Sequence, residues 1–238
     1  MSDSQTDATT GPADVCGGPA DATVRTPGVR VSSSAAAVGP SHATARAALE
    51  GLAGGFGAPA TGHGAELRWG LLYEALGGRH SGYVAAIELM YEGYLLHYRQ
   101  SRALAPGRDD GETALLAGDS AYAEGLRVVA GRGDVGSVRL LARLMSACAF
   151  LRDEGSPFVH DDALWAYTVA AMVAIEGADG RAAQDAGADG AAMLFDEVDE
   201  AFRDGRGDQV AGLVAAAVAR LGLADTHPLL DTLANEGS

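Results

Sequence analysis

The sequence predicts an all-α protein built as a helical bundle. Its 238 residues are 47% hydrophobic but only 6% aromatic, and Ala, Leu, Arg and Glu, all good helix formers, are abundant. β-Branched residues are sparse and no alternating apolar run extends beyond a few residues, so we expect no sheet. Glycine and proline instead divide the chain into segments of helical length.

The first segment, residues 1–40, is expected to be a disordered tail, and residues 41–238 a single helical-bundle domain. The tail contains no aromatic residue and little aliphatic surface, so burial cannot offset the entropy lost on ordering. Met1 is not followed by a basic and apolar leader, and no run of about 18 apolar residues occurs. We therefore expect a cytoplasmic protein without a membrane span.

The later segments are predicted helices with recognisable ends. They cover residues 64–76, 82–104, 112–130, 134–152, 162–176, 182–203, 207–221 and 228–235. Glycine or proline ends several of them, at Gly77–Gly78, Pro106–Gly107, Gly131–Gly133, Gly155–Pro157 and Gly177. Asp134 and Asp161 stand where N-caps belong, and Asp109–Asp110 is interpreted as a turn.

Three consecutive segments carry apolar residues at three- and four-residue steps, which places them on one face of each helix. The faces are Val84, Ile87, Tyr91, Tyr94, Leu95 and Tyr98; then Leu115, Leu116, Tyr122, Leu126 and Val129; then Val138, Leu141, Leu144, Met145, Cys148 and Leu151. Such stripes joined by short links predict a packed bundle. Cys148 is interpreted as a core residue, because Cys16 and Cys148 are too few for a disulfide framework or zinc site.

The charge balance excludes several partners. There are 32 acidic and 17 basic residues, a formal net charge of −15, and every basic residue is Arg. This acidity argues against nucleic acid or an anionic membrane surface as a partner. A GC-rich genome and a salt-adapted cytoplasm both explain the absence of Lys, and both explanations stay open.

Three stretches in order resemble the trans-isoprenyl diphosphate synthases, the polyprenyl synthetase family. They are Glu74–Gly78 (EALGG), Ala85–His97 (AAIELMYEGYLLH) and Thr113–Ala123 (TALLAGDSAYA), and the resemblance covers residues 65–152. It implies a truncated form of the isoprenoid synthase type I fold, and a dimer across the bundle faces. Glu88, Gly118 and Asp119 match family positions, and the resemblance implies structural roles for them.

The first aspartate-rich motif of that family, D-D-x-x-D, is missing. His97 is followed by Tyr98, Arg99 and Arg102 at the three aspartate positions, so no carboxylate there could hold magnesium. Arg99 and Arg102 are interpreted as a pair on one helical face, either facing solvent or an interface or contacting a diphosphate. His97 is interpreted as a structural histidine whose hydrogen bonds are satisfied within the bundle.

Several other side chains near this motif have alternative roles. Glu92, one turn after Glu88, could pair with Arg99 or face solvent. Tyr91, Tyr94 and Tyr98 are candidates to line a pocket, or to fill the one that the lost motif leaves. Asp161 and Asp162, with Asp196 and Asp199, are minority candidates for metal ligands, although Asp161 is read first as an N-cap.

These observations favour a degenerate family member in isoprenoid biosynthesis, acting as a non-catalytic or regulatory subunit. Its partner would be a catalytic isoprenyl diphosphate synthase in a heterodimer, or a second copy in a homodimer, with prenyl diphosphate as a possible ligand. The first alternative is a divergent active prenyltransferase, and the second a helical module that binds a prenyl lipid or a protein. No cofactor is expected, and Mg²⁺ would be needed only by the active enzyme.

Overall fold

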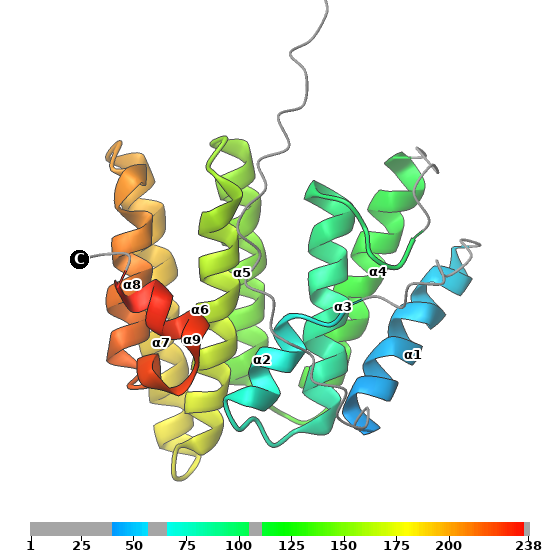
Figure 1. The fold of residues 1–238 in the computed structure, drawn as a ribbon, viewed down its shortest axis with the longest axis horizontal. Coiled ribbons are helices and arrows are strands. Elements are labelled where there is room, and N and C mark those ends of the chain that lie inside the picture. Colours follow the sequence, from blue (N-terminus) through cyan, green and yellow to red (C-terminus); the bar gives the residue numbers. More distant parts are fainter. Residues whose placement is uncertain (1–39, 57–65, 105–110, 236–238) are drawn as a thin grey trace, which may run out of the picture. The chain divides into compact units, whose positions relative to one another are not determined.

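A computed structural model describes residues 40–56, 66–104 and 111–235, and within these ranges the regular structure is entirely helical (Figure 1). The α-helices are α1 (Pro40–Gly55), α2 (Trp69–Ala75), α3 (Ser81–Tyr98), α4 (Gly111–Ala130), α5 (Val135–Asp153), α6 (Phe158–Gly177), α7 (Arg181–Arg203), α8 (Val210–Arg220) and α9 (Pro228–Asn235). Short 3-10 turns at Gly207–Gln209 and Ala224–Thr226 precede α8 and α9. The all-α prediction is confirmed.

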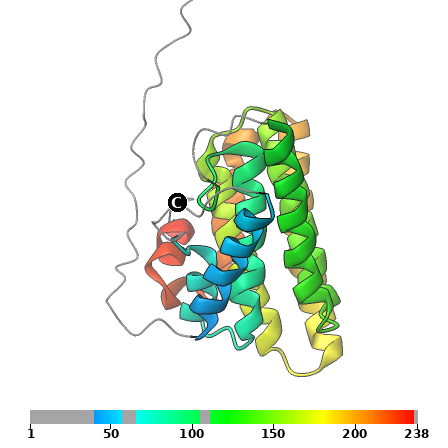
Figure 2. The same cartoon turned by 90° about the vertical axis from the view of Figure 1, so that its right-hand side faces the viewer.

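The helices pack as two groups. Helix α3 packs against α1, α2 and α4, whereas α5, α6 and α7 pack against one another, with α8 against α6 and α7 and α9 against α8. Figures 1 and 2 show the two groups standing side by side with their long helices roughly parallel or antiparallel. Contacts of α4 with α5 and of α2 with α6 join the groups. No described helix combines the length and apolar character needed to cross a membrane.

Helix α3 is enclosed on every side. Each residue from Tyr83 to Leu95 is buried, including the carboxylates of Glu88 and Glu92. The predicted apolar face is buried, with Tyr98 partly exposed, but the remaining faces of the helix are buried as well. A helix buried all round belongs to the centre of a bundle, where neighbours cover each of its faces.

Helices α3 and α4 approach closely because glycine lies at their contact. A Cβ on Gly93 would lie 2.9 Å from the Gly118 carbonyl oxygen, and one on Gly125 would lie 2.8 Å from the Ala86 carbonyl oxygen. Small residues of α4 therefore face α3, and the predicted stripe is wrong at Leu115 and Leu116, which are 51% and 56% exposed.

Most predicted helix boundaries are confirmed, and so is the apolar stripe of α5. Gly77, Gly133 and Gly155 have positive φ angles at the turns that follow α2, α4 and α5. The Asp134 side chain accepts a hydrogen bond from the Ser137 amide and caps α5, as predicted. Cys148 is a buried core residue, as expected.

Three boundaries differ from the prediction. Helix α2 begins at Trp69 instead of residue 64, and residues 66–68 are not helical. Helix α3 ends at Tyr98 instead of continuing to residue 104, and Arg99 is extended. Helix α6 begins at Phe158 after Pro157, so Asp161 lies inside the first turns and the N-cap interpretation is wrong. The predicted tail lies outside the described residues except for Pro40, which begins α1. The predicted turn at Asp109–Asp110 also lies outside the described residues.

Candidate functional site

The site indicated by the sequence lies at the middle of α3, around two carboxylates buried one helical turn apart. The side chains of Glu88 and Glu92 have no exposed surface. Glu88 Oε1 accepts hydrogen bonds from the backbone amides of Arg68 at 2.6 Å and Gly70 at 2.7 Å. This carboxylate therefore fixes the chain that enters α2 against α3. Two buried carboxylates also need a cation, because an unpaired buried charge is costly.

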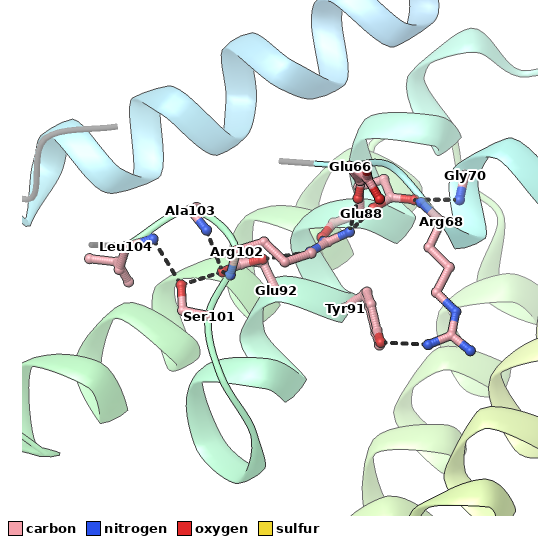
Figure 3. Close-up of polar contacts among 10 residues, drawn as sticks. All are labelled: Glu66, Arg68, Gly70, Glu88, Tyr91, Glu92, Ser101, Arg102, Ala103 and Leu104. Atoms are coloured by element: carbon pink, nitrogen blue, oxygen red, sulfur yellow. Dashed lines mark hydrogen bonds and ion pairs between the residues drawn. The ribbon is translucent and has the colours of Figure 1, made fainter. Parts of the chain in front are cut away.

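Arg102 is that cation. Its Nη1 donates to Glu88 Oε2 at 2.7 Å and its Nε donates to Glu92 Oε2 at 3.0 Å (Figure 3). The guanidinium also donates to the carbonyl oxygens of Glu66 and Glu88, at 2.7 and 3.2 Å. Burial alone would lower the pKa of Arg102, but the two carboxylates outweigh it and the pKa is raised.

Glu92 also determines where α3 ends. Its Oε1 accepts hydrogen bonds from the Ser101 hydroxyl and from the backbone amides of Arg102 at 2.9 Å and Ala103 at 3.0 Å. These amides bind a side chain instead of continuing the helix, so the chain folds back over α3 (Figure 3). The proposed pairing of Glu92 with Arg99, and the placement of Arg99 and Arg102 on one helical face, are therefore wrong.

A second cluster of charges joins α2 and α3 to the start of α6. Asp162 Oδ2 lies 3.0 Å from Nη2 of Arg68, and its Oδ1 lies 3.3 Å from Nη1 of Arg99. Arg68 also donates to the Tyr91 hydroxyl at 3.0 Å, and the Arg99 guanidinium lies 4.7 Å from the centre of the Phe158 ring. Both oxygens of this metal-ligand candidate are thus committed to arginine.

Asp161 points into the protein. Its side chain is fully buried, and its Oδ2 accepts a hydrogen bond from Nη2 of Arg152, on α5. Burial raises the pKa of the Asp161 carboxyl, and Arg152 opposes the increase. Burial also raises the pKa of the neighbouring Cys148 thiol, and the Asp161 charge adds to that effect.

Aromatic rings occupy the space between α3 and α6. The Trp165 ring stacks on Trp69, with centroids 6.3 Å apart, and meets Tyr91 and Tyr94 edge-on at 5.2 and 6.1 Å. The ring of Tyr98 lies 5.6 Å from that of Tyr94. The tyrosines proposed to line a pocket are thus placed in the packing between helices, and none of them lines the cleft around Arg132 or the smaller one between α5 and α7.

His97 packs against α4. Its ring stacks on Tyr122 with centroids 5.2 Å apart, and its Nε2 lies 3.2 Å from Oδ1 of Asp119. A Cβ on Gly118 would lie 2.7 Å from the imidazole, so only glycine leaves room for this ring. Gly118 and Asp119 therefore both contact His97.

The remaining acidic candidates lie on α7. Asp196 pairs with Arg143 of α5 at the surface, and Asp199 lines a small cleft between these helices. Within the described ranges, no three His, Cys, Asp or Glu side chains form a group suited to a metal ion.

Sequence reasoning overlooked Arg68 and Arg152, which hold Asp162 and Asp161. Arg68 is 94 residues from Asp162 along the chain, and no local pattern indicates that pairing. Its position between Leu67 and Trp69, both buried, is the one available signal, since an arginine in an apolar segment needs a partner. Comparison of the chain with protein-family models, curated proteins and solved structures finds no match.

Proposed function

We propose that this protein is a non-catalytic, isoprenyl diphosphate synthase-like subunit of isoprenoid biosynthesis that pairs with an active synthase. The observation that carries the proposal is the position of Arg102. The resemblance assigns this residue to a motif whose carboxylates hold magnesium, yet its guanidinium is bound between Glu88 and Glu92. A cation fixed at that point repels a metal ion and occupies the nearest buried carboxylates.

The packing near Arg102 supports the same proposal. Tyr91 and Tyr94 contact Trp165, so rings fill the space between α3 and α6 beside the resembled motif. Asp162, the nearest carboxylate from α6, is bound by Arg68 and Arg99. These contacts stabilise the bundle. Glu88, Glu92 and Asp162 are each paired with an arginine.

The outer face of α4 is the proposed surface for the partner synthase. Leu115 and Leu116 are adjacent and each is more than half exposed, although their segment otherwise packs closely on α3. Exposed apolar side chains side by side are typical of protein contacts. Each leucine is already about half buried, so covering the rest gives roughly 1 kcal/mol per side chain, enough to weaken a complex measurably when one is removed.

The first test is a condensation assay on the purified chain alone. It uses isopentenyl diphosphate, an allylic diphosphate and Mg²⁺, at low and at high salt. We expect no turnover, because Tyr98, Arg99 and Arg102 provide no metal ligand. Clear turnover would overturn the non-catalytic assignment and direct attention to Asp161, Asp162, Asp196 and Asp199.

The second test mixes the chain with a full-length synthase encoded by the same genome. We expect a heteromer on size-exclusion chromatography with light scattering, and a change in the rate or product length of the synthase. Leu116→Glu should weaken the complex, whereas Met193→Glu, an equally exposed apolar position on α7, should not. Failure to form any complex would contradict the pairing, and equal effects of both variants would contradict the α4 surface.

A further inference from the structure

A cleft of about 730 Å³ opens beside the first residues of α3. It lies among three turns, α2–α3, α4–α5 and α6–α7, which gather at the lower end of the helices in Figures 1 and 2. Helix α3 has 18 residues. Tyr83 of α3 lines the cleft, and at about 1.5 Å per residue it lies roughly 8 Å along the helix axis from Glu88 and roughly 14 Å from Glu92. Its volume is in the range of small-molecule sites.

Arginine side chains from each of the three turns line this cleft. They are Arg79, Arg132 and Arg181, and the imidazole of His80 joins them. Arg132 Nη2 lies 3.0 Å from His80 Nδ1, and Arg181 Nη1 donates to the carbonyl oxygen of Gly133, the next residue after Arg132. These contacts hold the three turns together around the cleft. Three arginines in one cleft contrast with the formal net charge of −15 of the chain.

The acidic groups of the cleft are occupied by the protein's own donors. Glu176, only 10% exposed, accepts hydrogen bonds from the Tyr73 hydroxyl at 2.6 Å and from the backbone amide of Arg79 at 3.0 Å. Asp134 accepts one from the Ser137 amide and one from the Tyr83 hydroxyl, both at 2.9 Å. Asp185, the third carboxylate that lines the cleft, accepts a hydrogen bond from Arg181 Nε at 3.1 Å, so each of the three carboxylates has a donor from the protein.

The donors, by contrast, are exposed. The side chains of Arg79 and Arg181 are 68% and 61% exposed, and each forms a single ion pair, with Glu176 and with Asp185. Arg132 forms no ion pair with any carboxylate in the described residues, and its guanidinium lies 5.8 Å from the centre of the Tyr83 ring. Guanidinium donors that remain available suit the oxygens of a phosphate group.

We propose that this cleft binds an oligophosphate group through Arg79, Arg132 and Arg181. Three guanidiniums that line one cleft suit a ligand with several anionic oxygens better than a single phosphate. Ile175, which also lines the cleft, provides an apolar contact for a group attached to the phosphates. The proposal is independent of the proposed function, because it involves different residues.

The test is isothermal titration calorimetry of the full chain with inorganic tripolyphosphate, with ATP and with inorganic phosphate. We expect tripolyphosphate to bind more tightly than phosphate. A further gain for ATP would identify a nucleotide as the source of the group, and equal binding would identify a free oligophosphate. Arg132→Gln should weaken binding about tenfold or more, because one hydrogen bond to a charged group is lost.

The matched control is Arg127→Gln, an exposed arginine of α4 that does not line the cleft. It should leave the affinity unchanged, and circular dichroism should show that both variants are folded. The proposal would be overturned by absence of tripolyphosphate binding to the parent chain. It would also be overturned if Arg132→Gln bound as the parent does, or if both variants lost affinity equally, since that result indicates diffuse charge attraction.

Discussion

Replacing Arg102 by methionine tests the reasoning about the end of α3 most directly. The variant keeps an unbranched apolar side chain but leaves Glu88 and Glu92, both without exposed surface, facing each other without a cation. It also removes the guanidinium donors to the Glu66 and Glu88 carbonyl oxygens. The backbone amides that donate to Oε1 of each carboxylate remain. The loss of stability is therefore smaller than that expected for two buried carboxylates without any hydrogen-bond partner.

The expected magnitude follows from the cost of removing one partner of a buried ion pair, about 3–5 kcal/mol. With a urea dependence of about 2 kcal/mol/M, the unfolding midpoint should fall by roughly 1.5–2.5 M. The assay is urea unfolding followed by circular dichroism at the helical minimum. Replacing both glutamates by glutamine in the same variant should recover part of the loss, because no unpaired buried charge then remains.

The matched control is Arg127→Met, which removes an exposed arginine paired only with Glu124 on the same helix. Its midpoint should equal that of the parent chain, since exposed pairs contribute little. A loss of less than about 1 kcal/mol for Arg102→Met would refute the claim that this residue compensates two buried charges. The position of Arg102 as the support for the proposed function would fall with it.

Two further predictions concern helix packing and pH. Gly93→Ala should destabilise the protein by about 1–3 kcal/mol in urea unfolding, because the new Cβ would lie 2.9 Å from the Gly118 carbonyl oxygen. Gly212→Ala, where a Cβ meets nothing within 4 Å, should stabilise α8 by up to about 1 kcal/mol, and similar effects at both sites would contradict the close α3–α4 contact. Burial, and then the charge of Arg152, lower the pKa of His160 below its ordinary 6.5, so the folded state should lose stability as pH falls below that value. His160→Gln should reduce this loss between pH 7.5 and 5.5, and parallel losses in both proteins would refute the role of His160.

The sequence by itself determined the helical class and most helix ends. Glycine with positive φ ends the turn at Gly77, Gly133 and Gly155, and Asp134 caps α5 through an amide three residues away. The stripe of Leu141, Leu144, Cys148 and Leu151 follows the 3.6-residue period and is buried as expected. These features depend on residues within one or two turns, so local patterns are sufficient to predict them.

Tertiary structure decided which side chains are buried around α3 and α4. The periodicity of α4 predicted Leu115 and Leu116 to be core residues, but Gly118 and Gly125 are the residues that contact α3. Sequence period alone does not distinguish a face of small residues that permits close approach from a face of large ones. The choice depends on the facing helix α3, where Gly93 permits the close approach and the His97 ring lies against Gly118.

Tertiary structure also decided the partners of the charges. Glu92 ends α3 because its carboxylate binds amides that follow the helix, and Asp162 holds Arg68 from a position 94 residues away. Ion pairs of this kind depend on how the helices pack, because packing decides which arginine lies next to a given carboxylate. Hydrogen bonds within a turn can be read from neighbouring residues, whereas pairs between helices are determined only when the folded chain brings them together.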